Sequence, residues 1–248
     1  MENSLVSIIT PSYNSEDFIK ETINSVLNQT YKNWEMIIVD DVSTDNSIQI
    51  IQEYQKKDSR IKLIELDTNS GAAVARNKAI EVANGKYIAF LDSDDLWKPE
   101  KLEKQIAFMQ ENNIVFSYSA YDLIDEDGKE LNITKDPIEK LHYKELLKEN
   151  QIGCLTAVYD QEKLGKCYMP LIRKRQDFGL WLSILKKIDY AIKVPENLAL
   201  YRVRKNSISS NKIDLIKYNF KLFNKHEELS IIQSSYYLLV NIYRKLKK

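Results

Sequence analysis

Short apolar runs alternate with stretches of helical periodicity over about the first 112 residues. The runs that we predict to be buried strands are 6–9, 35–39, 61–66 and 87–91. Between them, apolar residues recur at helical spacing and predict helices over 16–28, 44–57 and 71–84, the last closed by Gly85. This strand–helix repetition predicts an α/β fold with a mostly parallel sheet flanked by helices on both faces.

The pattern changes after residue 112. A strand is expected over 115–123, followed by a turn at 125–128 whose Asp-Gly pair is a strong hairpin signal. The elements expected beyond it are helices over 138–150 and 177–187, short strands over 190–194 and 198–201, and two helices from about Asn211. No internal repeat and no low-complexity linker separates these parts, so the join near residue 112 marks a change of role within one structure.

Composition and charge exclude some classes of function. With 44% apolar and 29% charged residues, the 248-residue chain has the composition of an ordinary globular protein. A net charge of zero gives no reason to expect nucleic acid as a partner. Two cysteines, Cys154 and Cys167, fit a reducing cytosol. No signal peptide is recognisable and no segment reaches the ~17–20 apolar residues that span a bilayer, so we expect a cytoplasmic protein.

The most distinctive chemistry lies in Asp92-Ser93-Asp94, directly after a predicted strand. Carboxylates at the carboxyl end of a central strand lie where open α/β sheets bind ligands. Because neighbouring carboxylates repel one another, such a cluster usually needs a divalent cation. Oxygen ligands suit Mg²⁺ or Mn²⁺, which in turn bind phosphates. The alternative is a solvated, acidic start of a helix.

Two other predicted strand ends carry candidate ligand-binding residues. Pro11 lacks a backbone N–H and is expected to stop the first strand. That would leave Tyr13 and Asn14 at the edge of the sheet, where a planar base could stack or hydrogen-bond, although a simple turn is the alternative. At the end of the second strand, a cap for the next helix does not explain the pair Asp40 and Asp41. One such carboxylate can accept from a base or a ribose hydroxyl.

Further candidates lie outside the strand ends. Arg76 lies in an Ala-rich helix whose small neighbours would let it reach a pocket, although a surface arginine is the alternative. Asp177 opens a helix, either as a favourable first-turn charge or as an acid directed at a cleft. Arg202, Arg204 and Lys205 place three cations in four positions. They could clamp a leaving diphosphate, but exposed cations are usually solvated.

The end of the chain allows two interpretations. Tyr236-Tyr237-Leu238-Leu239-Val240 precedes Arg244, Lys245, Lys247 and Lys248. Aromatic residues beside cations suit the headgroup boundary of a membrane. Alternatively, this is a terminal helix packed on the domain, with a basic end that complements its dipole. The sequence leaves both open.

Taken in order, the motifs resemble family 2 glycosyltransferases of the GT-A fold. The resemblance runs from Ser7 to about Ser209, and the segment from Arg173 to Trp181 is most similar to bacterial capsular or teichuronic-acid-type polysaccharide transferases. The motifs that carry it are Thr10–Asn14, Val39–Asp45, Gly71–Asn77, Asp92–Asp95, Asp177 with Leu180-Trp181-Leu182, and Tyr201-Arg202.

The resemblance implies an inverting transfer from a nucleoside diphosphate sugar, commonly a UDP-sugar, to a hydroxyl of a glycan or polyprenyl-linked saccharide. It implies a donor-binding half, 1–112, an acceptor-binding half, 113–210, and a helical tail, 211–248, working at the inner face of the cytoplasmic membrane. The implied site residues are Asp94 and Asp92 for Mn²⁺ or Mg²⁺, Asp177 as the general base, and, for the nucleotide-sugar, Pro11, Tyr13, Asn14, Asp41, Arg76, Asp92, Ser93 and Arg204.

Two departures from the family pattern affect the implied chemistry. Gln176 stands where many relatives have Glu, which lowers the negative charge beside Asp177. Arg204 stands where many have His; an arginine binds phosphate bidentately but does not easily replace a metal ligand. We therefore expect the metal and Arg204 to share neutralisation of the diphosphate. The alternatives are a nucleotidyltransferase, for which no Gly-rich triphosphate loop is found, and a non-catalytic nucleotide-sugar-binding protein.

Overall fold

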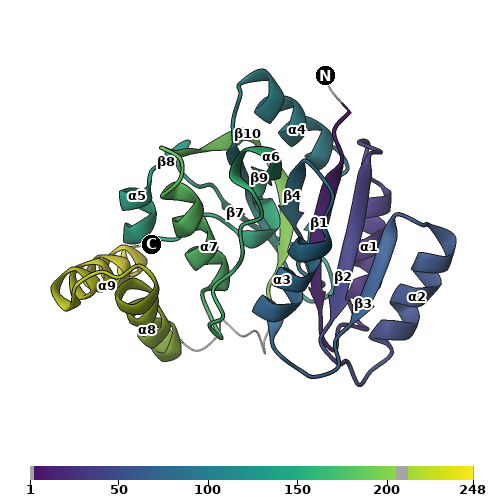
Figure 1. Cartoon of the computed structure of the whole chain (residues 1–248), viewed down its shortest axis with the longest axis horizontal. Helices are drawn as coiled ribbons and strands as arrows, with labels where there is room; N and C mark the ends of the chain where they lie inside the picture. Colours follow the sequence, from purple (N-terminus) through teal and green to yellow (C-terminus); the bar gives the residue numbers. More distant parts are fainter. Residues whose placement is uncertain (1–2, 205–211, 248) are drawn as a thin grey trace.

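A mixed sheet of ten strands lies between two layers of helices in the computed structural model, which describes residues 3–204 and 212–247 (Figure 1). The strand order is β3-β2-β1-β4-β9-β6-β10-β5, with β7 paired to β6 and β8 to β10. The strands are β1 (Val6–Ser12), β2 (Trp34–Asp40), β3 (Ile61–Glu65), β4 (Tyr87–Phe90), β5 (Leu96–Trp97), β6 (Phe116–Ile124), β7 (Glu130–Lys135), β8 (Lys140–Leu141), β9 (Val158–Asp160) and β10 (Ala191–Arg202).

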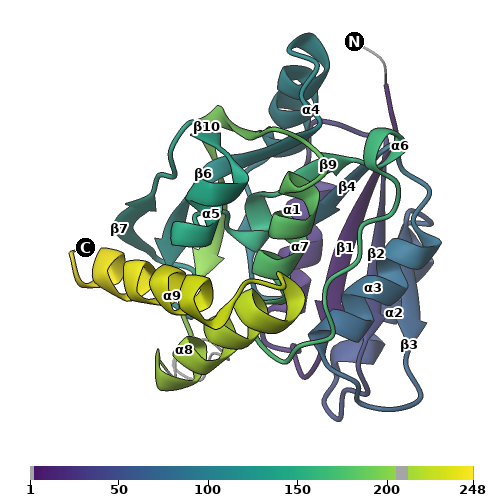
Figure 2. The same ribbon diagram turned by 60° about the vertical axis from the view of Figure 1, so that its left-hand side comes forward.

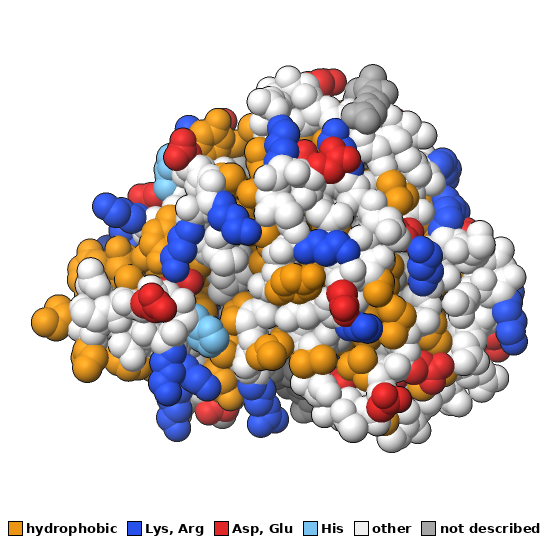
Figure 3. Space-filling view, in the orientation of Figure 1, with side chains coloured by type: hydrophobic (Ala, Val, Ile, Leu, Met, Phe, Trp, Pro, Cys, Tyr) orange, Lys and Arg blue, Asp and Glu red, His pale blue; other side chains and the backbone are white. Residues whose placement is uncertain are grey.

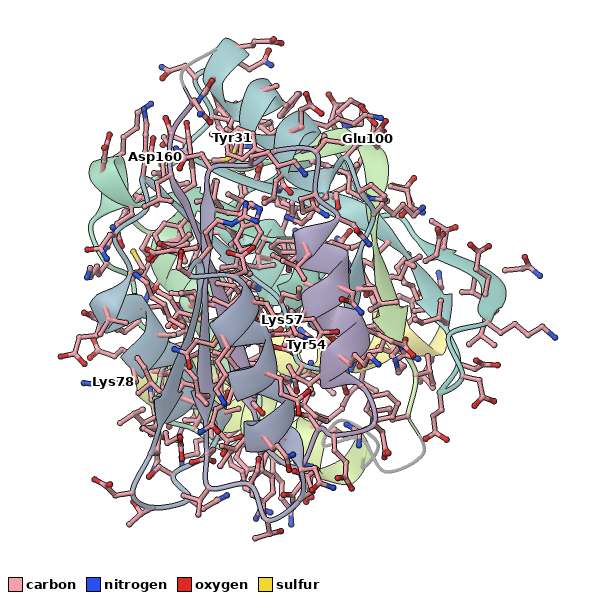
Figure 4. All side chains as sticks on the ribbon, turned by 90° about the vertical axis from the view of Figure 1, so that its right-hand side faces the viewer. Tyr31, Tyr54, Lys57, Lys78, Glu100 and Asp160 are labelled. Atoms are coloured by element: carbon pink, nitrogen blue, oxygen red, sulfur yellow. The ribbon has the colours of Figure 1, made fainter. Side chains whose placement is uncertain are left out.

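Helices cover both faces of the sheet, as the strand–helix repetition predicts. Helices α1 (Ile19–Leu27), α2 (Ser47–Lys57) and α4 (Lys101–Glu111) pack on one face. The other face carries α3 (Ala72–Val82), α5 (Tyr143–Lys148) and α7 (Gln176–Leu185). Figure 4 looks onto the first face, where the hydroxyl of Tyr54 on α2 donates to Asn24 on α1 at 3.1 Å.

The remaining helices belong to the second half and the tail. They are a 3₁₀ turn (Cys154–Thr156), α6 (Gln161–Leu164), α8 (Lys212–Lys221), a π-helical turn (Leu222–His226) and α9 (Ile231–Leu246). The two predicted tail helices are therefore present. Figures 1 and 2 both place α8 and α9 side by side at the end of the molecule remote from α2.

Strands β1 and β2 are buried along their whole length, which explains their continuous apolar sequences. Successive side chains alternate between the layers: Ile9 and Ile37 pack with α3, whereas Ile8 and Met36 pack with α1. Strands β3, β2, β1 and β4 are parallel. The chain proceeds from β1 to β2 on one side and later returns to β4 on the other. The carboxyl ends of β1 and β4 thus flank the switch point at which open sheets bind ligands.

Pro11 does not stop the first strand, contrary to the prediction. Strand β1 continues to Ser12, and Pro11 pairs in register with Val39 of β2. Leu91 donates its N–H to the carbonyl of Ile9. Since alternate residues of a strand face the same side, the nitrogen of Pro11 also faces β4, whose pairing with β1 ends at Ile9. The missing N–H costs no ladder bond there, which is where sheets tolerate proline.

Gly85 has a different role from the predicted helix cap. Helix α3 ends at Val82, and Gly85 is not among the glycines with positive φ. A Cβ at this position would lie 2.5 Å from the backbone nitrogen of Ser7 and 2.8 Å from the carbonyl oxygen of Leu5. Glycine is required because the backbone of β1 approaches so closely.

The second half agrees less well with the predicted elements. The expected helix 138–150 is wrong over its first part, which forms β8, and only α5 is helical. The two short strands expected over 190–194 and 198–201 are one strand, β10, whose register against β6 shifts between Lys193 and Ala199. Strands β5 and β9 were not predicted, because two or three residues carry too little periodicity to detect.

Candidate active site

The turn after β2 is held by the carboxylate of Asp40. This group is fully buried and accepts from the backbone N–H of Ser43 at 2.7 Å, the Ser43 hydroxyl at 2.6 Å and the Ser12 hydroxyl at 2.9 Å. Asn14 ties the neighbouring turn to it, since its N–H donates to Ser43 Oγ at 2.9 Å and its amide oxygen accepts from the N–H of Thr44 at 2.8 Å. The predicted ligand residue Asn14 therefore shapes two loops.

Asp41 serves the loop that follows β3. Its carboxylate accepts the backbone N–H groups of Ser70 at 2.6 Å and Gly71 at 2.7 Å. Gly71 has a φ of 89°, a left-handed conformation that favours glycine. At the same edge, Tyr13 is 52% exposed, whereas Pro11 is buried within β1. Tyr13 is thus open to a ligand, and the nucleoside-binding roles of Asp41, Pro11 and Tyr13 stay predictions.

The acidic turn after β4 is paired with guanidinium groups. Asp92 and Asp94 lie in the turn that leads to β5, with the half-buried Ser93 between them. An oxygen of Asp92 lies 2.5 Å from Arg76 Nη2, and an oxygen of Asp94 lies 3.1 Å from Arg204 Nη1. The structure therefore brings together four of the predicted site residues from β4, α3 and the end of β10.

The carboxylates of this turn are crowded. Burial, and then the charge of Asp92, raise the pKa of Asp94 even though Arg204 acts in the opposite direction. Burial and the neighbouring Asp94 raise the pKa of Asp95 well above its usual range. Asp95 accepts the backbone N–H of Arg202 at 2.9 Å, so it anchors the turn to β10. Additional positive charge beside Asp94 would favour its ionised form.

Arg202 fixes the position of this turn. Its side chain is fully buried and pairs with Glu21 of α1 at 2.6 Å. Its Nε donates to the carbonyl of Asp94 at 2.9 Å, and its Nη1 donates to the carbonyl of Glu126 at 2.8 Å. Arg204, two residues later, is one-third exposed and is the cation that faces the Asp94 carboxylate. Lys205, the third predicted cation, lies outside the described residues.

Asp177 lies in the first turn of α7, half-buried, and accepts from the amide of Asn150 at 3.3 Å. Its neighbour Gln176 links α7 to α3, because its amide oxygen accepts from Arg76 Nη1 at 3.0 Å. The amide nitrogen of Gln176 donates to the carbonyl of Ile172 at 2.8 Å. The amide of Gln176 is therefore used as both donor and acceptor. A glutamate carboxylate at this position could not donate and would repel the carbonyl oxygen of Ile172.

Three residues to which the sequence assigned no role lie around Asp177. Burial, and then the charges of Asp95 and Asp177, raise the pKa of Tyr121 to about 12. Burial and the charge of Asp92 raise the pKa of the Cys154 thiol. Arg175 lies two residues before Asp177 in the sequence, at the end of a run of three cations. That run was the only available signal, because the other two are brought here by tertiary folding.

Residues 7–163, well over half of the chain, match the family described as Glycosyl transferase family 2. The chain belongs to glycosyltransferase family 2. It is 50% identical over 232 residues to the provisionally named teichuronic acid biosynthesis glycosyltransferase TuaG of Bacillus subtilis, covering 94% of this chain and 92% of TuaG. It is 43% identical over 249 residues to the UDP-Glc:α-D-GlcNAc-diphosphoundecaprenol β-1,3-glucosyltransferase WfgD of Escherichia coli, covering 100% of this chain and 96% of WfgD.

Solved structures confirm the predicted GT-A fold of this glycosyltransferase. S. aureus TarS 1–349, crystallised with UDP-GlcNAc, superposes with a TM-score of 0.75 at 22% identity, over 98% of this chain and 72% of TarS. The mannosyltransferase PcManGT of Pyrobaculum calidifontis, solved with GDP-Man and Mn²⁺, gives a TM-score of 0.70 at 19% identity, over 96% of this chain and 70% of PcManGT.

The carboxylates after β4 suit a divalent cation whose remaining ligands would come from the substrate. Among residues 3–204 and 212–247, no group of three or more His, Cys, Asp and Glu side chains is placed to hold a metal. Mg²⁺ usually binds through one or two carboxylates plus substrate phosphates and water. Asp94, crowded by Asp92 and partly exposed, matches that donor set.

Proposed function

We propose that this glycosyltransferase moves a sugar, with inversion, from a UDP-sugar to a hydroxyl of an undecaprenyl-diphosphate-linked saccharide in bacterial surface polysaccharide synthesis. The convergence of Asp94, Arg204 and Asp177 at one end of the sheet carries the proposal. The donor and acceptor named for WfgD, which matches this chain along its whole length, supply the substrate classes. In this scheme residues 1–112 bind the donor, residues 113–210 bind the acceptor, and residues 211–248 are the tail.

Asp177 acts as the general base. It accepts the proton of the attacking acceptor hydroxyl while the bond between the anomeric carbon and the diphosphate breaks. General-base assistance of this kind contributes roughly 10²–10⁴-fold to rate. Asn150 holds one carboxylate oxygen of Asp177. Arg76, which bridges Asp92 and Gln176, fixes the distance between the base and the leaving-group side of the site.

Asp94, with Asp92 beside it, would hold Mn²⁺ or Mg²⁺. When bound, the cation supplies Lewis-acid stabilisation of the charge that develops on the diphosphate. Arg204 contributes the second positive charge, since a guanidinium binds phosphate bidentately. Phe18 supports it, because the guanidinium carbon of Arg204 lies 4.7 Å from the centre of that ring.

An assay of transfer from a panel of UDP-sugars to a synthetic GlcNAc-diphospholipid tests this function, and the release of UDP is the quantity measured. Asp177→Asn should retain UDP binding and lose at least about 10²-fold in transfer rate. Asp189→Asn, an exposed carboxylate beyond the far end of α7, is the matched control and should keep its rate. Near-normal turnover of Asp177→Asn would exclude it as the base. Release of pyrophosphate would favour a nucleotidyltransferase, and UDP binding without turnover a non-catalytic protein.

We also propose that α9 places the enzyme on the inner face of the cytoplasmic membrane. No helix in the described part of the chain is long and apolar enough to cross a bilayer. One face of α9 packs on the domain, where the Asn241 amide donates to the Leu147 carbonyl at 2.8 Å and Tyr237 contacts Phe223. The interpretation of the tail as a helix packed on the domain therefore accounts for this face of α9. It does not account for the opposite face.

The opposite face of α9 is apolar and exposed. Its side chains recur every three or four residues, as one face of a helix requires. They are Ile232 (82% exposed), Tyr236 (56%), Leu239 (66%), Tyr243 (57%) and Leu246 (81%). Figure 3 shows apolar side chains gathered over α9 at the left end of the molecule. Arg244, Lys245 and Lys247 add positive charge near its end, whereas Lys248 lies outside the described residues.

An apolar face beside cations suits an anionic lipid surface. Leu239→Ser combined with Leu246→Ser should reduce co-sedimentation with phosphatidylglycerol-containing vesicles at least fivefold, because both side chains leave the water only on binding. Glu53→Gln on α2 is the control. Unchanged sedimentation of the double variant would contradict the proposal, as would a dimer that buries this face in solution.

A further inference from the structure

Arg175 is a cation whose bonding is incomplete in the structure. It precedes α7 in a left-handed conformation, with φ 68° and ψ 26°. Its Nε is buried and has no hydrogen-bond partner among the described residues. Burial lowers the pKa of Arg175, and the charge of Asp177 opposes that effect. A buried charged donor without an acceptor costs free energy, and a bound anion would remove that cost.

Arg76 has a similar deficit, because its Nε also lacks a partner in the described part of the chain. It is only 8% exposed, and its Nη atoms donate to Asp92 and Gln176, yet its Nε is also buried without a partner among the described residues. Burial lowers the pKa of Arg76, but the charges of Asp92 and, more weakly, Asp177 raise it. Both guanidinium groups are therefore within electrostatic reach of the proposed base, and each retains an unused donor.

The neighbours of Arg175 differ from it. Lys174 pairs with Asp214 of α8 at 3.3 Å, so its charge is already balanced. Arg173 is exposed, and water can satisfy its donors. Within this run of three cations, Arg175 is the one with a buried and unpartnered donor beside Asp177.

We propose that Arg175 binds the diphosphate of the acceptor, at a site separate from that of the donor diphosphate. The inference rests on the proposed function and specifies its acceptor: a sugar attached directly to a diphospholipid, with the attacked hydroxyl on that same sugar. In such a molecule, the diphosphate lies one sugar ring from the hydroxyl. Asp177 receives the hydroxyl proton and Arg175 holds the phosphate, while Asp94 and Arg204 remain with the donor.

Steady-state transfer with two acceptors tests the assignment: a GlcNAc-diphospholipid and a neutral GlcNAc alkyl glycoside of the same chain length. Arg175→Asn removes the charge with a residue that tolerates the left-handed conformation. It should raise KM for the diphospholipid roughly 10- to 100-fold, the effect expected for a lost charged hydrogen bond. KM for the neutral glycoside should change less than threefold. Arg175→Lys should fall between Arg175→Asn and the parent enzyme.

Arg173→Gln is the matched control and should leave both KM values within about threefold. UDP affinity and slow hydrolysis of the UDP-sugar report on the donor site alone, and both should be unchanged in Arg175→Asn. Equal losses with both acceptors would overturn the phosphate role of Arg175. If the parent enzyme neither hydrolyses nor transfers any UDP-sugar, the proposed function itself fails, which is a distinguishable result.

Discussion

The turns after β2 and β4 are both acidic, both at carboxyl strand ends, and yet they are stabilised in different ways. The carboxylate of Asp40 accepts from one backbone N–H and two serine hydroxyls, and that of Asp41 from two backbone N–H groups. Asp92 and Asp94 instead face Arg76 and Arg204. Neutral donors, namely backbone N–H groups and serine hydroxyls, hold the carboxylates after β2, whereas charged guanidinium groups pair with the carboxylates after β4.

Electrostatics separates the same two kinds of carboxylate. Burial alone would raise the pKa of Glu35, a structural group at the other end of β2, but hydrogen bonds from Lys62, Ser7 and Asn84 lower it. Asp94 has a raised pKa because its burial and its acidic neighbour outweigh its single arginine. A strand-end acid that its surroundings do not satisfy is therefore the better candidate for ligand binding.

Removal of divalent cations should give the largest difference between the two turns, because only the turn after β4 is proposed to bind a cation. With EDTA, transfer should fall by at least about 10³-fold, because several kcal/mol of charge stabilisation is lost. Mn²⁺ or Mg²⁺ should restore it, while the unfolding temperature of the ligand-free protein stays the same. Undiminished rates in chelator would place all diphosphate neutralisation on the arginines.

Paired substitutions should give the next largest effect. Asp94→Asn should lower transfer roughly 10²–10³-fold, as expected for loss of one group that stabilises the transition state, with no loss of stability. Asp40→Asn should do the reverse: an amide group would face the N–H of Ser43, at a cost of about 1–3 kcal/mol in the free energy of unfolding, with rates within tenfold. Activity assays and urea unfolding of both variants measure the contrast. A loss of stability in Asp94→Asn would contradict this contrast between a functional and a structural carboxylate.

The pH dependence of stability should give the smallest effect. Because the folded-state pKa of Glu35 lies below its usual value, its contribution is present above about pH 4.5 and is lost as the pH falls through the lowered pKa. Glu35→Gln should therefore be less stable than the parent by about 1–3 kcal/mol at pH 7, with the difference shrinking towards pH 3. Urea unfolding against pH measures this, with the exposed Glu53→Gln as control. A constant difference would contradict the linkage.

Local periodicity was sufficient to predict β1 to β4 and their helices, because each is a continuous apolar run or stripe. It failed where the cause is a distant segment. Gly85 is explained only by the backbone of β1, which crosses beside it. Arg202 was one of three cations interpreted either as a diphosphate clamp or as solvated, but its side chain is buried and joins α1, the acidic turn and the β6–β7 hairpin, three segments far apart in sequence. Asp177 and Arg76 were predicted to belong to one site, which stays a prediction, and the amide of Gln176 that links α7 to Arg76 was not foreseen.

Pro11 has a consequence for the acidic turn. The next hydrogen bond of the parallel ladder between β1 and β4 would need an N–H at position 11, and proline has none. The two strands therefore cannot pair beyond the hydrogen bond from Leu91 to Ile9, and residues 92–95 form a turn before β5. Any other amino acid at position 11 would offer a donor that competes for the backbone of the turn. The proline thus ends the pairing between β1 and β4, although β1 itself continues, and it leaves Asp92 and Asp94 in a turn where they can bind a ligand.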